Sequence, residues 1–151
     1  MPPNPVRLAA RAVIVHNARL LLVNAWPKGR STLLCAPGGG VEPGASLPDN
    51  LAREVHEETG LRVDVTAPCL VNEFHDPRSG FHQVEVFFRC KIIGGSRISA
   101  DWQDPENIVT HHIWATQEDM AGLHFKPSSL AQVAFADPDA LSYDPLETIV
   151  M

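Results

Sequence analysis

Three glutamates near the end of one predicted helix are the side chains best placed to carry chemistry in this sequence. Glu54, Glu57 and Glu58 occupy positions i, i+3 and i+4, which share one face of a helix. Like charges at this spacing repel one another, and the C-terminal end of a helix favours cations. A bound Mg²⁺ would offset both costs, since it takes carboxylate oxygens as ligands and is commonly shared with substrate phosphates. A merely solvated acidic face is the alternative.

A glycine-rich segment before this helix favours the metal-site interpretation. Four glycines fall within the seven residues from 38 to 44, directly after an apolar run. Glycine tolerates positive φ and close backbone approach, so such a turn can direct carbonyl groups at a metal and amide groups at a phosphate. Taken alone, a segment of this kind is most often only a turn, and it gains meaning from the glutamates that follow.

Local signals predict that residues 46–59 form the helix that positions these glutamates. Ser46 followed by Asp49 is a capping-box pattern, and Pro48 suits the first turn. Gly60 is available for the left-handed position after the last turn. Apolar residues recur at every fourth position and predict a buried face made of Leu47, Leu51 and Val55.

The rest of the chain predicts mainly strands, with short helices toward the end. The predicted strand segments are 9–16, 19–24, 33–37, 61–75 (one or two strands), 81–93 and 109–115. A hairpin is expected around Asn17, a turn at 76–80 and a loop at 94–107. This order predicts an α/β fold in which helices pack on a mixed sheet.

The two ends of the chain carry weaker signals. Residues 1–5 are expected to form a mobile lead. A helical turn is expected at 116–123 and a last helix at 127–136, capped by Ser128 or Ser129. The tail at 137–151 has no assigned structure.

Composition limits location and partners. The chain has 151 residues and a net charge of −6, which argues against nucleic acid and anionic membranes as partners. No segment is typical of a signal peptide or a membrane span. Three cysteines, Cys35, Cys69 and Cys90, lack paired spacing and are expected to be core or strand residues in a reducing compartment. The sequence therefore predicts a cytoplasmic protein and leaves a homodimer open.

Residues 39–61 resemble the signature of the Nudix hydrolases, Gly-x5-Glu-x7-Arg-Glu-U-x-Glu-Glu-x-Gly-U, in which U is aliphatic. Eight of nine fixed positions match with the family's spacing, namely Gly39, Arg53, Glu54, Val55, Glu57, Glu58, Gly60 and Leu61. The exception is Ala45, where the family has its first glutamate. The resemblance implies an α/β Nudix fold, a mixed β-sheet sandwiched between α-helices, in a single domain spanning 1–151.

The resemblance also implies a reaction. Nudix hydrolases cleave a pyrophosphate bond in a small-molecule substrate, usually a nucleoside diphosphate linked to another moiety, with Mg²⁺ or in some cases Mn²⁺ as cofactor. On this basis Glu57 and Glu58 are expected to be the principal metal ligands and Glu54 a ligand or the base that activates water. Arg53 is expected to orient the carboxylates, and the Gly39 carbonyl to complete the metal shell.

Many Nudix hydrolases use a further acid outside the signature. Asp101, Asp104 and Glu106 lie in the predicted loop at 94–107, and Glu85 lies on the strand before it. Glu106 is the preferred candidate because its loop leads into the predicted strand at 109–115.

Ala45 keeps other functions open. In the family, the glutamate at this position supports the arginine, so its absence predicts a looser metal site around Arg53. A Nudix-like module that binds a nucleotide without cleaving it is therefore the main alternative. Isomerase chemistry on an allylic diphosphate is a third, but it usually needs a cysteine near the site, and only Cys35 is close in sequence. Substrate identity depends on loops outside the signature.

Overall fold

A mixed β-sheet forms the centre of the protein. The computed structural model describes residues 5–136 and 139–151, and within them nine strands form one sheet. Six of the nine lie side by side in the order β3-β2-β1-β6-β5-β8. The other three lie off this path, since β4 pairs with β1, β7 with β2 and β9 with β5. The strands are β1 (Arg7–His16), β2 (Arg19–Asn24), β3 (Leu34–Cys35), β4 (Gly38–Gly40), β5 (Arg62–Asp76), β6 (Phe81–Ile93), β7 (His112–Ala115), β8 (Ser142–Tyr143) and β9 (Glu147–Thr148).

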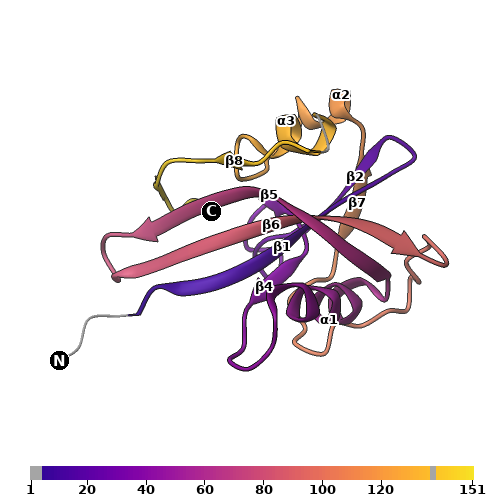
Figure 1. Ribbon diagram of the computed structural model, residues 1–151, viewed down its shortest axis with the longest axis horizontal. Coiled ribbons are helices and arrows are strands. Elements are labelled where there is room, and N and C mark those ends of the chain that lie inside the picture. Colours follow the sequence, from indigo (N-terminus) through magenta and orange to yellow (C-terminus); the bar gives the residue numbers. More distant parts are fainter. Residues whose placement is uncertain (1–4, 137–138) are drawn as a thin grey trace.

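Helices cover both faces of the sheet, as predicted. Figure 1 shows α1 (Leu47–Thr59) on one side, with α2 (Gln117–Met120) and α3 (Leu130–Phe135) on the other. Strand β2 shows why both faces must be covered, because Leu20, Leu21 and Leu22 are all fully buried. Leu21 packs in the core beneath α1, whereas Leu20 and Leu22 pack in the core beneath α2 and α3. This alternation is expected for a strand with two buried faces.

Most of the predicted elements are confirmed. The turn of the β1–β2 hairpin consists of Asn17 and Ala18, with φ values of 52° and 62°. Such positive φ at both central residues is typical of a tight hairpin turn. The segment at 61–75 forms one long strand, β5, whose pairing with β6 is irregular between Val65 and Leu70.

The end of the chain differs from its prediction. Helix α3 is shorter than expected, and Ser129 at its N-cap position makes no capping hydrogen bond. Capping by Ser129 was therefore wrong, because its backbone is already helical and its hydroxyl donates instead to Asp144 at 2.6 Å. In the tail, β8 and β9 pair in parallel with β5. Of the predicted mobile lead at 1–5, only Pro5 falls within the described residues.

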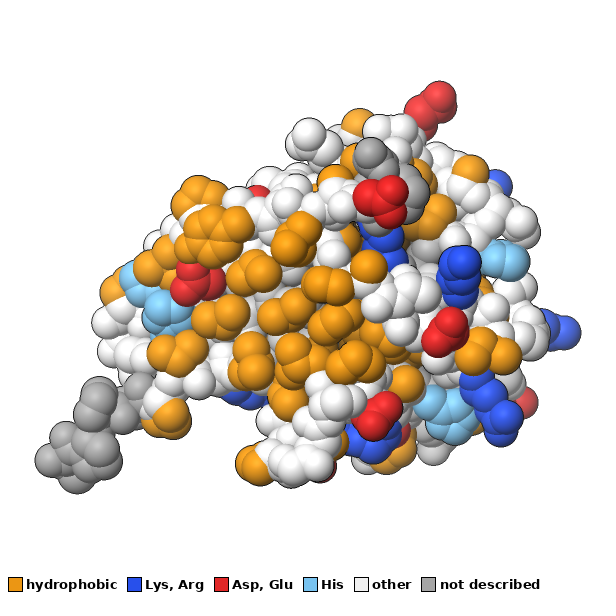
Figure 2. Space-filling view, viewed as in Figure 1, with side chains coloured by type: hydrophobic (Ala, Val, Ile, Leu, Met, Phe, Trp, Pro, Cys, Tyr) orange, Lys and Arg blue, Asp and Glu red, His pale blue; other side chains and the backbone are white. Residues whose placement is uncertain are grey.

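The surface carries apolar side chains on the face toward the viewer in Figure 2, where they gather over the middle strands of the sheet. None of the helices at 5–136 and 139–151 is long and apolar enough to cross a membrane. The three cysteines are free, with Cys69 and Cys90 buried and Cys35 half-buried in a strand, as predicted.

Candidate active site

Helix α1 is fixed at both ends and along its apolar face, and this fixes where its acids point. The Ser46 hydroxyl accepts a hydrogen bond from the Asp49 backbone amide at 3.1 Å, and Gly60 adopts the left-handed conformation with φ of 78°. Leu51 and Val55 are fully buried against the sheet. The predicted cap and stop signal are therefore confirmed, and so is the buried face at Leu51 and Val55, while Leu47 packs half-buried against the same core. This packing constrains rotation of α1 about its axis.

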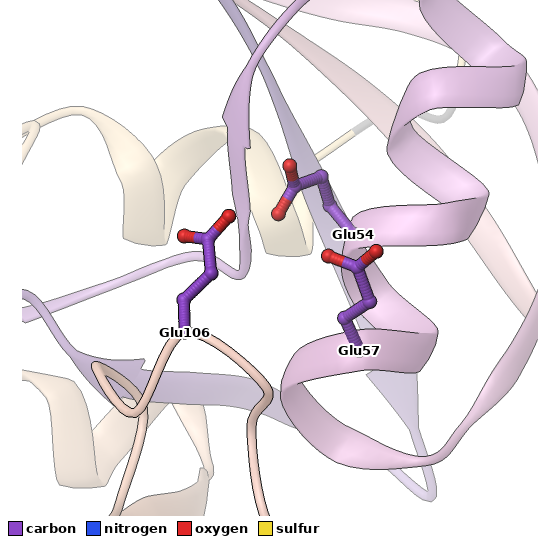
Figure 3. A group of neighbouring side chains, drawn as sticks. All are labelled: Glu54, Glu57 and Glu106. Carbon is purple, nitrogen blue, oxygen red and sulfur yellow. The ribbon is translucent and has the colours of Figure 1, made fainter.

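Three carboxylates converge at one point. Glu54 and Glu57 reach it from α1, and Glu106 reaches it from the loop before β7 (Figure 3). Each offers an oxygen atom, and these three oxygens lie within 4.8 Å of one another. Three hard oxygen donors at this spacing fit a divalent cation such as Mg²⁺ or Mn²⁺, which would also relieve their mutual repulsion.

The glycine strand β4 lies directly against this group. A Cβ atom on Gly39 would be only 3.0 Å from the carboxylate carbon of Glu54, and one on Gly38 would be 2.1 Å from the carbonyl oxygen of Ala10. Glycine is therefore required at Gly38, where a side chain would clash with backbone, whereas a side chain at Gly39 would push the Glu54 carboxylate aside. The Gly39 backbone therefore lies close to the Glu54 carboxylate. Metal binding by the Gly39 carbonyl stays a prediction.

Arg53 holds the acids of α1 and also reaches the loop before the helix. Its guanidinium donates to Glu57 at 2.9 Å and lies 3.5 Å from a Glu54 oxygen. It also lies 3.8 Å from a Glu42 oxygen. Ala45, in contrast, is exposed in the turn before the helix. Glu42 is thus a partner of Arg53 that sequence reasoning missed, three residues before the position at which the family has its glutamate.

Glu58 lies apart from the three converging carboxylates. Its carboxylate accepts a hydrogen bond from the Gly38 backbone amide at 3.0 Å, and burial raises its pKa to about 8. Burial also raises the pKa of Glu54, and the nearby Glu57 carboxylate raises it further. The structure therefore brings Glu54 and Glu57 together and directs Glu58 to β4, so metal binding by Glu58 stays a prediction.

The other candidate acids have different surroundings. Glu85 is buried and pairs with Arg11 at 2.7 Å. Asp104 is also buried, and its carboxylate accepts hydrogen bonds from the backbone amides of residues 106, 108 and 109. Asp101 is exposed. Within the described residues, Glu106 is therefore the acid outside α1 that joins the group of three.

A cavity of about 270 Å³ is connected to the site through Arg11. Its walls include Trp26, Phe74 and Phe81, and the C-terminal segment 147–150 closes part of it. Arg11 lines the cavity as well, and its guanidinium donates to the Gly38 carbonyl at 3.3 Å, which links the cavity to the glycine strand. Sequence reasoning missed Arg11, because its contacts join residues far apart along the chain.

Cys35 also lines this cavity, but its chemistry does not favour catalysis by a thiolate. Burial raises the pKa of its thiol to about 11, despite the nearby Arg11 guanidinium. A thiol with such a pKa is almost entirely protonated at neutral pH and is a weak nucleophile. This observation argues against the isomerase alternative.

Comparison with known proteins gives consistent relatives. A "MutT-like protein" from Streptomyces ambofaciens is 33% identical over 113 residues, which is 71% of this chain and 69% of that protein. An "ADP-ribose pyrophosphatase" from Methanocaldococcus jannaschii is 28% identical over 96 residues, covering 62% of this chain and 56% of that protein. "Nucleoside diphosphate-linked moiety X motif 6" from Mus musculus is 26% identical over 111 residues, covering 68% of this chain but only 33% of the mouse protein.

Solved structures support the fold. A NUDIX hydrolase from Nitrosomonas europaea superposes with a TM-score of 0.70 at 21% identity, covering 85% of this chain and 86% of that one. A structure described as UDP-X diphosphatase superposes with a TM-score of 0.69 at 17% identity, covering 95% of this chain and 70% of that one. The family model described as "NUDIX domain" matches residues 6–137. The chain therefore belongs to the NUDIX domain family.

Proposed function

We propose that this protein is a divalent-metal-dependent pyrophosphohydrolase that acts on a nucleoside diphosphate linked to another moiety. The convergence of Glu54, Glu57 and Glu106 beside the Gly39 backbone carries the proposal. The names of the relatives support it, since they include a pyrophosphatase and a protein named for a nucleoside diphosphate-linked moiety.

The proposed metal ligands are the three converging carboxylates, with the Gly39 carbonyl and Glu58 as further candidates. A bound Mg²⁺ or Mn²⁺ would screen the charge of the diphosphate and lower the pKa of bound water. Arg53 keeps Glu57 in place through the 2.9 Å hydrogen bond. Glu54 belongs to the same group, and its proposed role is either a metal ligand or the base that accepts a proton from the attacking water.

The cavity that Arg11 connects to the site is the proposed place for the nucleoside. Its aromatic side chains Trp26, Phe74 and Phe81 offer flat apolar surfaces for a base. The guanidinium of Arg11 lies in the same cavity and can interact with an anionic group. The diphosphate would then extend from the cavity past β4 toward the glutamates.

The test is product release from a panel of nucleotides with Mg²⁺, with Mn²⁺ and with EDTA. The panel contains ADP-ribose, UDP-glucose, nucleoside triphosphates and a dinucleoside polyphosphate. Hydrolysis of at least one compound, abolished by EDTA and restored by added metal, is the expected result. A Glu118→Gln variant removes an exposed acid from α2, outside the site, and should behave like the native protein. Full activity in a metal-free preparation would contradict the mechanism.

A nucleotide-binding module remains the second candidate because the glutamate of the family is replaced by Ala45. The structure weakens this argument, since Glu42 approaches Arg53 from the same loop. The two functions separate experimentally. A module would bind a panel compound in calorimetry and release no product with either metal.

A further inference from the structure

The loop that delivers Glu106 is joined to α1 by one aromatic side chain. Trp102 lies four residues before Glu106, and its indole nitrogen donates to the Glu57 carbonyl at 2.8 Å. Glu57 therefore takes part twice, since its carbonyl accepts this hydrogen bond and its carboxylate belongs to the group of three. This hydrogen bond therefore connects two of the residues that must meet at the proposed metal.

The Glu57 carbonyl needs a donor from outside the helix. The last carbonyls of a helix lack partners in the next turn. The amide that would continue the pattern belongs to Leu61, and it donates instead to the Thr59 hydroxyl at 3.1 Å. Trp102 supplies the donor for Glu57, so the loop is docked on a backbone group left free by the end of the helix.

Packing reinforces this hydrogen bond. The Trp102 ring lies so close to Gly60 that a Cβ there would be 2.9 Å from it. The ring also meets His56 edge to face, with ring centroids 5.2 Å apart. Gly60 thus has two functions, since its φ of 78° ends the helix and its missing side chain makes room for the indole.

The far side of the loop is held separately. Asn24 at the end of β2 accepts hydrogen bonds from the amides of Thr110 and His111 at 2.9 and 3.0 Å, and it donates to the Ile108 carbonyl at 2.8 Å. Between the two attachments, Asp104 organises the backbone around Glu106. Glu106 is therefore presented by a loop tied to α1 at one end and to the sheet at the other.

We infer that Trp102 is the positioning residue for Glu106, setting the distance between this carboxylate and the acids of α1. The inference rests on the proposed function, in which Glu106 contributes to the metal site. If Trp102 acts through Glu106, its removal should harm turnover only while Glu106 is present. If Trp102 merely covers the end of α1, its removal should have the same effect with or without Glu106.

The experiment is a double-mutant cycle with Trp102→Phe, Trp102→Ala and Glu106→Gln. Phenylalanine keeps an aromatic ring beside Gly60 and loses the donor to Glu57, whereas alanine loses both. We expect kcat to fall about 3-fold to 10-fold for Trp102→Phe and about 10-fold to 100-fold for Trp102→Ala, as expected for a misplaced catalytic group. In the Glu106→Gln background the same changes should alter kcat by less than about twofold. Equal losses in both backgrounds would overturn the inference.

Two measurements on the loop itself do not depend on turnover. In metal-free protein, amide hydrogen exchange at residues 103–109 should be about tenfold faster in Trp102→Ala, because the loop loses its attachment. The Mn²⁺ dissociation constant should rise about 3-fold to 10-fold in the same variant. Gln103→Ala changes an exposed neighbour and serves as the matched control. Unchanged exchange and unchanged Mn²⁺ affinity would overturn the inference.

The results also separate this inference from the proposed function. A native protein that cleaves nothing on the panel but binds Mn²⁺ would contradict the hydrolase proposal, and the exchange and Mn²⁺ measurements would still decide the role of Trp102. A Glu106→Gln variant with native kcat and native Mn²⁺ affinity would overturn the role of Trp102 and remove Glu106 from the proposed ligands, whereas metal-dependent hydrolysis by the native protein would still support the hydrolase proposal.

Discussion

Replacing Glu57 and Glu58 one at a time by glutamine tests the arrangement of the acids most directly. The two residues are adjacent in sequence, but only Glu57 belongs to the converging group, whereas Glu58 accepts a hydrogen bond from the Gly38 amide. Glutamine keeps the length of the side chain and an acceptor oxygen, and it removes the charge. The two variants therefore separate metal binding from support of the glycine strand.

The expected effect of Glu57→Gln is large on turnover and small on stability. Loss of a principal electrostatic group lowers kcat by roughly 100-fold to 1,000-fold. The ion pair with Arg53 is only half-buried, with side-chain exposures of 39% and 26%, so its loss should cost about 0.5 kcal/mol. Relief of repulsion from Glu54 and Glu106 offsets part of this, and the melting temperature should change by no more than about 2 °C.

Glu58→Gln has two distinguishable outcomes. If Glu58 binds metal, as the family signature predicts, kcat should fall by roughly 100-fold, as for Glu57→Gln. If it only supports β4, glutamine can still accept the hydrogen bond from Gly38, and kcat should fall less than about tenfold. Its carboxylate has a pKa raised by burial, so losing the charge should not destabilise the metal-free fold.

The assay is steady-state hydrolysis of the best panel compound with Mg²⁺, together with calorimetric Mn²⁺ titration and thermal melting. Glu118→Gln in α2 serves again as the control for loss of an exposed acid. The reasoning fails if Glu57→Gln keeps near-native turnover and Mn²⁺ affinity, because the metal site would then lie elsewhere. A large fall in melting temperature for Glu57→Gln would also refute it.

Two further predictions concern the loop before α1 and the cavity. Ala45→Glu adds an anion near the start of the helix, so Mn²⁺ binding should tighten about 2-fold to 5-fold without loss of stability. Weaker binding with a lower melting temperature would show that the loop around Glu42 and Arg53 has no room for it. Ile149→Trp should raise KM at least about tenfold and leave kcat nearly unchanged, because Ile149 lines the cavity. Leu146→Trp, in the same segment but outside the cavity lining, is the control, and equal effects of both would exclude the cavity as the nucleoside site.

The signature helix could be predicted from sequence because its determinants are local. A cap, a stop glycine and an apolar stripe all lie within 46–60, and each is confirmed. The long strands β1, β2, β5 and β6 could be predicted equally well, since their apolar residues are divided between two cores. Strand β4 was missed, because it consists of three glycines and was expected to be a turn. Strands β8 and β9 are two-residue strands with mostly exposed side chains, so no periodic pattern marks them.

The site was predicted only in part, because several of its contacts join distant residues. Spacing along the helix places Glu54 and Glu57 together, but it does not reveal that the next residue turns toward Gly38. The pairing of Arg11 with Glu85 spans 74 residues, and the hydrogen bond from Trp102 to Glu57 spans 45. Trp102 stands out in the sequence as an aromatic residue in a polar loop, but the sequence does not reveal that it contacts Glu57.

The departure from the family pattern at Ala45 is better understood through these contacts than through the signature alone. Arg53 is held by Glu57 and Asn50 within α1, and the buried Asn50 side chain also accepts a hydrogen bond from the Glu42 amide at 3.2 Å. The loop before the helix is therefore tied to α1 by its backbone, with the Glu42 carboxylate near the guanidinium. Since the converging carboxylates are in place without a glutamate at position 45, the missing family residue does not by itself favour a binding module over a hydrolase.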